Sequence, residues 1–358
     1  MHDCLIVGAG VIGMSLAREL AGHGLSVHVI DRAAVGKEAS WAGAGILPPA
    51  NPATSIHSLQ KLRALSHVLH PRWAATLREE TGIDTGYRKC GGICLARSAG
   101  EAASLRALKG LYDEEDIAFE QLNSEELLEL EPVFRPLVHA GKITAAFQIP
   151  DESQLRNPDH LRALLASCNA RGVKVTADVA AKSFEVTAGR MVAVHTDSKP
   201  IFAESVCIAS GAWTHAILQQ LRVPNGIMPV RGQMVMYRCD KQPFSRIINE
   251  GPRYLVPRDD GRVLVGSTEE EVGFDKSTTE DGLDELMTLA ESLIPELVRE
   301  RVERTWAGLR PGSFDGFPYL GKIPGLDNAF VAAGHFRSGL QMSPATAIVM
   351  SQLIRGET

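Results

Sequence analysis

One arginine in an apolar, glycine- and proline-interrupted segment suggests chemistry. Arg310 lies between Leu309 and Pro311 in TWAGLRPGSFDGFPYLG, and Trp306 precedes it by four positions. A guanidinium keeps its charge, and its planar fork can meet a carboxylate with two parallel hydrogen bonds. The segment therefore indicates a bound anion. The two candidates are the carboxylate of a substrate and an internal partner such as Asp315.

The amino-terminal segment has the pattern of a dinucleotide-binding unit. Residues 3–32, DCLIVGAGVIGMSLARELAGHGLSVHVIDR, read as strand, tight turn, helix and second strand. Gly8 permits the turn, Gly10 lets backbone N–H groups approach a pyrophosphate, and Gly13 lets the helix pack closely on the strand. Asp31 ends the second strand, where a carboxylate can accept hydrogen bonds from a ribose. This unit predicts a bound dinucleotide and leaves open whether it is NAD or FAD.

A small-residue segment, KEASWAGAGILPPA, follows this unit. Ser40 could hydrogen-bond a phosphate, and the small residues 42–45 would leave room beside a flat ring. The alternative is an ordinary flexible loop.

The carboxyl-terminal segment supplies a second helix that could face an anion. NAFVAAGHFRSGLQMSPATAIVMSQLI reads as a strand over 329–333, a loop between Gly334 and Gly339, and an apolar helix that Pro344 is expected to open. Reduced flavin carries negative charge at its N1–C2=O edge, which a helix N-terminus would stabilise. A nicotinamide carries no such charge. FAD therefore accounts for both ends of the chain with one ligand.

The length and composition indicate a water-soluble globular protein of two domains. The chain has 358 residues, of which 44% are hydrophobic and 22% charged. Its formal net charge of -6 argues against a nucleic-acid partner, and no apolar run is long enough for a transmembrane helix. The six cysteines form no C-x-x-C pair, so we expect free thiols and a cytoplasmic location.

The order of strand and helix patterns predicts an α/β fold: a Rossmann-type FAD-binding domain and a second, α+β substrate domain. The segments MPVRGQMVMY, RYLVPR and RVLVGST read as an antiparallel sheet in the second domain. We expect 1–80, 142–222 and 303–358 in the FAD-binding domain, and 81–141 and 223–302 in the substrate domain.

Taken in order, several motifs resemble the glycine oxidases of the D-amino-acid oxidase family of FAD-dependent amine oxidases. They are VGAGVIG, GAG after Trp41, GGICLA, ASGAW, PVRGQ, YLVPR, WAGLRP…DGFPYLG and AAGHFRSG. Related sarcosine oxidases attach flavin to a cysteine in their carboxyl-terminal part. This chain has no cysteine after Cys239, so we expect non-covalent FAD.

The resemblance implies roles for individual residues. Arg310 would bind the substrate carboxylate, with Tyr254 beside it, Arg337 near flavin and substrate, and Ile46 narrowing the substrate pocket. The alternatives are a core aromatic for Tyr254 and a loop-stabilising role for Arg337. The expected FAD contacts are Gly8, Gly10, Val11, Ile12, Gly13, Asp31, Arg32, Ala39, Ser40, Ala44, Gly45, Ile46, Val179, Gly334, His335, Phe336, Arg337, Ser338, Gly339, Leu340 and Gln341.

The activity that the resemblance implies is oxidative deamination of glycine or another small amine, with O2 as acceptor and H2O2 as product. The imine would supply thiamine thiazole synthesis. No side-chain base and no metal is expected, and a homo-oligomer is left open. Three departures from relatives bear on the substrate: Asp31 for glutamate, Ile46 for methionine and Ser338 for asparagine. The alternatives are a D-amino-acid or sarcosine oxidase, a dehydrogenase that reduces another carrier, and a non-enzymatic flavin-binding sensor.

Overall fold

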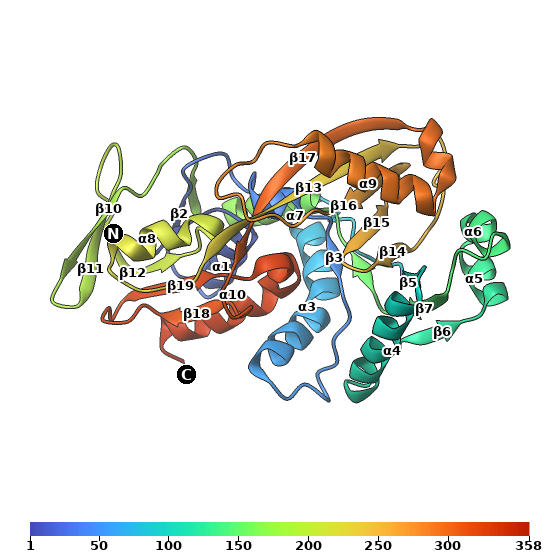
Figure 1. Ribbon diagram of the computed structural model, residues 1–358. Helices are drawn as coiled ribbons and strands as arrows, with labels where there is room; N and C mark the ends of the chain where they lie inside the picture. Colours follow the sequence, from blue (N-terminus) through green and yellow to red (C-terminus); the bar gives the residue numbers. More distant parts are fainter. Residues whose placement is uncertain (358) are drawn as a thin grey trace.

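The computed structural model describes residues 1–357 and contains two large sheets and two small ones (Figure 1). The first large sheet has the order β18-β19-β12-β1-β2-β9 and is parallel except for β18 at its edge. Its inner strands are continuous apolar runs, as expected where helices or strands cover both faces. The strands are β1 (His2–Val7), β2 (Val27–Ile30), β9 (Lys174–Thr176), β12 (Ala203–Ile208), β18 (Tyr319–Lys322) and β19 (Ala329–Ala333).

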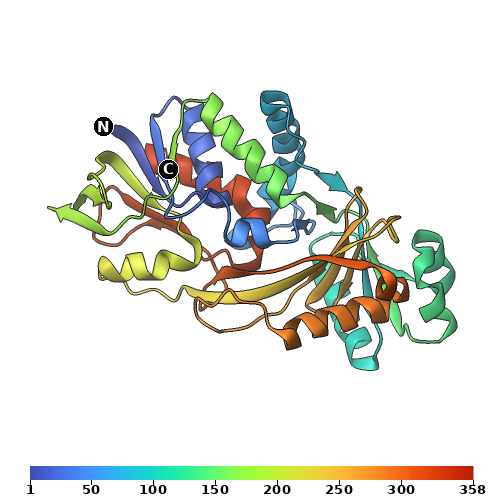
Figure 2. The same ribbon diagram turned by 90° about the horizontal axis from the view of Figure 1, so that it is seen from above.

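Helices cover one face of this sheet. Helix α1 (Val11–Gly22) packs between α7 (Asn157–Ala170) and α10 (Gly339–Arg355), and α10 also contacts α3 (Ser58–Thr81). The other face is covered by α8 (Thr214–Gln220) and by the hairpin of β10 (Ser183–Thr187) and β11 (Arg190–His195) (Figure 2). This arrangement confirms the predicted Rossmann-type unit.

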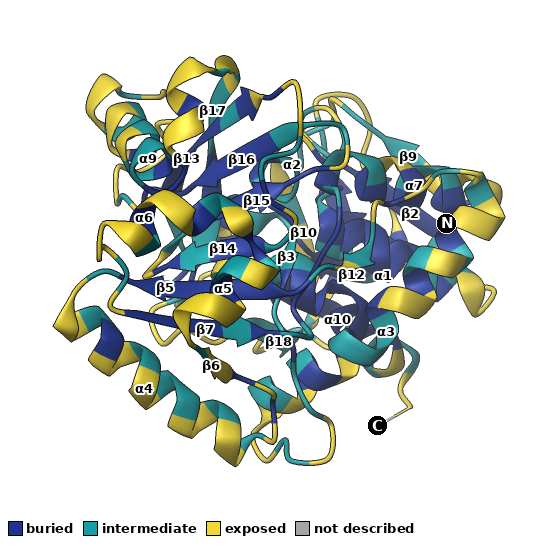
Figure 3. Cartoon of the chain, turned by 90° about the vertical axis from the view of Figure 1, so that its right-hand side faces the viewer, coloured by how far each residue is buried: buried dark blue, intermediate teal, exposed yellow. Residues whose placement is uncertain are grey.

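The second large sheet has the order β17-β13-β16-β15-β14-β5-β7-β6 and is mostly antiparallel. Helix α9 (Glu280–Leu293) packs on β13 and β16, and α4 (Ala99–Glu114) packs on β5. Figure 3 shows the strands mostly buried and the outer sides of α4, α5 (Ser124–Leu130) and α6 (Arg135–His139) exposed. The strands are β5 (Gly92–Ala96), β6 (Glu120–Leu122), β7 (Ala145–Ile149), β13 (Met228–Arg238), β14 (Ile247–Glu250), β15 (Arg253–Pro257), β16 (Arg262–Gly266) and β17 (Arg301–Gly312).

Two strands of this second sheet come from segments that we expected in the FAD-binding domain. β7 pairs with β5 and β6, and β17 pairs with β13 along almost its whole length. Both pairings are between segments far apart in the chain, so no local pattern indicates them. The domain boundaries themselves stay a prediction.

Strand β17 also connects the two sheets. It contacts α2 (Ala39–Ala42) and two short helices, Gly211–Trp213 and Phe336–Ser338, which follow strands of the first sheet. A three-stranded sheet has the order β3 (Ile46–Leu47), β8 (Ser153–Gln154) and β4 (Arg88–Lys89), and its strand β3 contacts α10. Among residues 1–357, no helix combines the length and apolar character that spanning a membrane requires.

Candidate active site

The glycine turn after β1 is tightly packed. Gly8 has a φ of 118°, and a Cβ there would lie 2.4 Å from the Ala209 carbonyl oxygen. A Cβ on Gly13 would lie 1.9 Å from the carbonyl oxygen of Gly8. Only glycine lets the start of α1 come this close to the strand, so the N-terminus of α1 is directed at the cavity beyond the sheet.

Asp31 is held by the backbone at the end of β2. Its Oδ2 accepts a hydrogen bond from Ala9 N at 2.7 Å, and its Oδ1 accepts one from Ala33 N at 3.0 Å. Burial raises the pKa of this carboxyl, while the two backbone donors act in the opposite direction. The neighbouring Arg32 guanidinium stacks 3.6 Å from the ring centre of Trp213, a cavity residue that we had not singled out in ASGAW.

The small-residue segment is ordered by side chains from three distant elements. Asn157 donates to the carbonyl oxygen of Ser40 at 2.7 Å, and the Trp306 indole N–H donates to that of Ala42 at 3.0 Å. The buried guanidinium of Arg258 donates to the Ala44 carbonyl at 2.7 Å. The flexible-loop alternative is therefore wrong.

The same segment contacts the N-terminus of α1. Ser40 Oγ accepts a hydrogen bond from Val11 N at 2.9 Å.

The carboxyl-terminal helix begins earlier than expected. α10 starts at Gly339 and contains Pro344 within its second turn, so the expectation that Pro344 opens the helix is wrong. Pro344 has no N–H to give to the Leu340 carbonyl; the Ser343 hydroxyl donates to that oxygen instead, at 2.9 Å. The N-terminus of α10 consequently lies at the cavity, and Gly339 is one of the residues that line it.

His335, in the loop before α10, does not have the properties of a base. Its Nε2 lies 3.1 Å from the Thr346 hydroxyl, and burial lowers its pKa to about 3. The ring is therefore neutral and ties the loop to the helix.

Arg310 lies on β17 with its guanidinium folded over Gly232 of the neighbouring strand. A Cβ on Gly232 would lie 2.1 Å from Nη2 of Arg310. The guanidinium donates to the carbonyl oxygen of Thr268 at 3.2 Å and to the Ser267 hydroxyl at 2.5 Å. Burial lowers its pKa, although the group remains a cation.

Within residues 1–357 no carboxylate lies within ion-pair distance of this guanidinium. Asp315 instead accepts a hydrogen bond from Phe317 N, so the internal salt bridge considered for Arg310 is absent.

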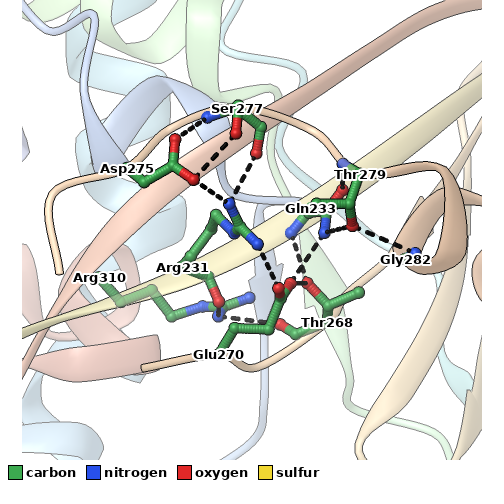
Figure 4. Close-up of polar contacts among 9 residues, drawn as sticks. All are labelled: Arg231, Gln233, Thr268, Glu270, Asp275, Ser277, Thr279, Gly282 and Arg310. Carbon is green, nitrogen blue, oxygen red and sulfur yellow. Dashed lines mark hydrogen bonds and ion pairs between the residues drawn. The ribbon is translucent and has the colours of Figure 1, made fainter. Parts of the chain in front are cut away.

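A second arginine network supports the carbonyl groups that hold Arg310 (Figure 4). The buried Arg231 pairs with Glu270 at 2.5 Å and Asp275 at 2.8 Å, and its own carbonyl oxygen accepts from Arg310 at 3.4 Å. Glu270 also accepts from the hydroxyl of Thr268, whose carbonyl binds Arg310. The network therefore fixes the two carbonyl oxygens that accept from Nη1 of Arg310, without neutralising the guanidinium.

Three other predicted substrate residues line the same cavity, with different contacts. The Tyr254 hydroxyl lies 3.6 Å from Sδ of Met234, which is on β13, the strand next to that of Arg310. The Arg337 guanidinium pairs with Glu269 at 3.3 Å and donates to the Pro252 carbonyl at 2.7 Å. Both contacts hold the loop before α10 in place, as the loop-stabilising alternative for Arg337 predicts. Ile46 lies on β3 at the cavity wall.

One continuous cavity of about 630 Å³ joins all of these groups. Of the predicted cofactor residues, Gly13 and Gly334 do not line it; Gly13 acts through helix packing, and Gly334 only begins the loop. Sequence reasoning missed Glu152, Asn249 and Met234, because nothing local marks them. The predicted residues that do line it are Gly8, Gly10, Val11, Ile12, Asp31, Arg32, Ala39, Ser40, Ala44, Gly45, Ile46, Val179, Tyr254, Arg310, His335, Phe336, Arg337, Ser338, Gly339, Leu340 and Gln341.

These residues fit FAD. A side chain at either close-packed glycine of the turn would clash with the backbone, so the turn can accommodate a pyrophosphate only with glycine there. Asp31 stands at the end of β2, where it can bind a ribose. The N-termini of α1 and α10 face the same cavity. No cluster of His, Cys, Asp and Glu suited to a metal occurs among residues 1–357. The six cysteines are free thiols.

Comparison with known proteins agrees with this geometry. Residues 3–353 match the family model DAO, FAD dependent oxidoreductase. The chain is 33% identical to glycine oxidase from Pseudomonas aeruginosa over 98% of this chain and 94% of that one. It is 32% identical to the bifunctional protein ThiO/ThiG from Synechocystis, covering 98% of this chain and 51% of that protein.

A solved structure, glycine oxidase from Geobacillus kaustophilus, superposes with a TM-score of 0.93 at 31% identity, covering 100% of this chain and 95% of that one. The chain therefore belongs to the DAO family of FAD dependent oxidoreductases.

Proposed function

We propose that this FAD-dependent enzyme oxidises glycine, or another small amine that carries a carboxylate, and passes the electrons to O2. The observation that carries the proposal is Arg310: a half-buried cation on the cavity wall that no carboxylate of residues 1–357 neutralises. A substrate carboxylate would supply the missing anion through two parallel charge-assisted hydrogen bonds. The relatives named glycine oxidase support glycine as that substrate.

The chain's own residues would bind and orient the substrate. Arg310 would hold the carboxylate, and the Tyr254 hydroxyl, two strands from Arg231, would add a donor at the same wall. FAD, when bound, supplies the acceptor for a hydride from the amine-bearing carbon. Because His335 is neutral and tied to Thr346, we assign no side-chain base. Fixed placement of the reacting carbon then contributes much of the rate.

The imine product would hydrolyse to glyoxylate or serve thiamine thiazole synthesis. The similarity to the ThiO/ThiG protein supports the second fate but extends over only about half of that relative.

An anaerobic experiment tests the substrate. Glycine, sarcosine and D-alanine are each mixed with the holoenzyme, and bleaching of the flavin absorbance is followed. We expect Arg310→Ala to keep its FAD and to lose 10²-fold or more in kcat/KM for glycine, roughly the loss of two hydrogen bonds to a charged group. Wild-type kinetics in a variant that retains FAD would refute the carboxylate role of Arg310.

A second experiment tests the electron acceptor. We expect one H2O2 per glycine consumed in air. A dehydrogenase that uses another carrier would reduce its flavin with glycine and yield little H2O2.

A further inference from the structure

A buried carboxyl in the cavity has no role in the function proposed above. Glu152 follows β7, is 3% exposed and lines the same cavity as Arg310. Its Oε2 accepts a hydrogen bond from the Asn249 amide at 2.9 Å. Gly92 makes room for it, because a Cβ there would lie 1.8 Å from Oε2.

No cation accompanies this carboxyl within residues 1–357. No Lys, Arg or His side chain forms an ion pair with Glu152, and the ionisable groups that feel its charge are Cys90, Cys94 and Tyr112. The pKa of each of these three is raised by burial, so they are neutral near pH 7. Burial also raises the pKa of Glu152 to about 7. A buried carboxyl that is ionised is normally paired with a cation.

Strand order locates Glu152 relative to Arg310. Asn249 on β14 stands opposite Tyr254 on β15, which stands opposite Gly266 on β16; directly opposite residues share one face of a sheet. Arg310 binds the residues that follow Gly266. The backbone of β14 is therefore two strands, or about 10 Å at the usual strand spacing, from the backbone of β16, at whose end Arg310 binds.

This separation excludes glycine as the partner of both groups. The amine of glycine is bonded to the carbon that bears the carboxylate, so it cannot reach Glu152 while Arg310 holds that carboxylate. A longer substrate could.

We propose that Glu152 and Asn249 form a second substrate subsite, which binds an ammonium or similar cationic donor at the far end of an amine whose carboxylate Arg310 holds. The subsite rests on the proposed function and deepens it: the preferred class would be short amino acids or N-substituted glycines with a terminal cation. Glu152 offers a carboxylate and Asn249 a carbonyl oxygen, and both are acceptors that suit such a donor.

Two achiral probes of nearly equal shape test the subsite. N-(2-aminoethyl)glycine has a terminal ammonium, and N-propylglycine has a methyl group in the same position. Flavin reduction in the holoenzyme is measured anaerobically with both, and the ratio of their kcat/KM values is compared among wild type, Glu152→Gln and Glu250→Gln. Glu250 is the next residue after Asn249 on β14 and pairs with Arg97, so it serves as a matched control.

We expect wild type and Glu250→Gln to favour the ammonium probe by about tenfold or more, the effect of one hydrogen bond to a charged group. Glu152→Gln should lower that ratio by about tenfold. A wild-type ratio at or below one, or a ratio that Glu152→Gln leaves unchanged, overturns the subsite. So does a variant that shifts the flavin spectrum and slows both probes equally, since the carboxyl would then act on the cofactor.

The glycine reaction separates this proposal from the one on which it rests. If glycine, sarcosine and both probes all fail to bleach the wild-type flavin, the proposed function fails. If glycine bleaches it and the ammonium probe has no advantage, only the subsite fails.

Discussion

Replacing Gly232 by alanine tests the position of the Arg310 guanidinium without touching Arg310. The new Cβ would lie 2.1 Å from Nη2, whereas ordinary contact begins at 3.4 Å, so the guanidinium must move by about 1.3 Å (3.4 − 2.1). The atoms displaced are the far end of a flexible side chain, so the strand can stay in place. Gly232 also has no positive φ, so alanine brings no backbone strain.

The expected loss follows from that movement. A displacement of about 1 Å in a positioning group can cost about 10²-fold, and hydrogen bonds to a charged group contribute roughly 1.5–3 kcal/mol. We therefore expect kcat/KM for glycine to fall by about 10- to 100-fold, mainly through KM, with FAD still bound.

Steady-state kinetics of the FAD-loaded variant measure this change. Gly321→Ala is the control, because Gly321 lies on β18 with open space where its Cβ would be. An alanine at 232 that leaves KM and kcat at wild-type values would show that the carboxylate is not held at this guanidinium.

Three further outcomes are expected. Gly13→Ala should yield protein without FAD, since its Cβ would strike the Gly8 carbonyl oxygen, which cannot move aside; the flavin-to-protein absorbance ratio measures this. Arg231→Met should lower the free energy of unfolding by about 2–3 kcal/mol, less than for a fully buried pair because Asp275 is half exposed. It should also raise KM for glycine more than it lowers kcat; equal KM values would remove the supporting role of Arg231. For Glu152, the folded pKa of about 7 exceeds the ordinary glutamate value of 4.5, so the folded protein binds more protons between these values and its stability falls as pH rises through them. Urea unfolding of the holoenzyme at pH 5 and pH 8 should show a loss of stability about 2.5 kcal/mol larger in wild type than in Glu152→Gln; equal losses would contradict the raised pKa.

Much of the fold could be predicted because its signals are local. The glycine turn, α1 and Asp31 are neighbours in the chain, and their spacing reflects one tight turn and one helix. The continuous apolar strands of the first sheet and the alternating strands of the second were likewise recognisable. The start of α10 was missed because proline is common in the first turn of a helix. Here the proline lies five residues after the start of the helix, and the hydroxyl of the serine before it makes the hydrogen bond that the missing proline N–H would have made.

By itself the sequence determined the fold class, the FAD-binding unit and Arg310 as the residue to which an anion should bind. Only the tertiary structure decided that this guanidinium lies over Gly232, that carbonyl groups rather than Asp315 hold it, and that β17 belongs to the second sheet. It also brought Glu152 to the same cavity. The physical reason is range: turns and helices arise from neighbouring residues, whereas strand pairing and cavity walls join segments that lie tens to hundreds of positions apart, which no local pattern encodes.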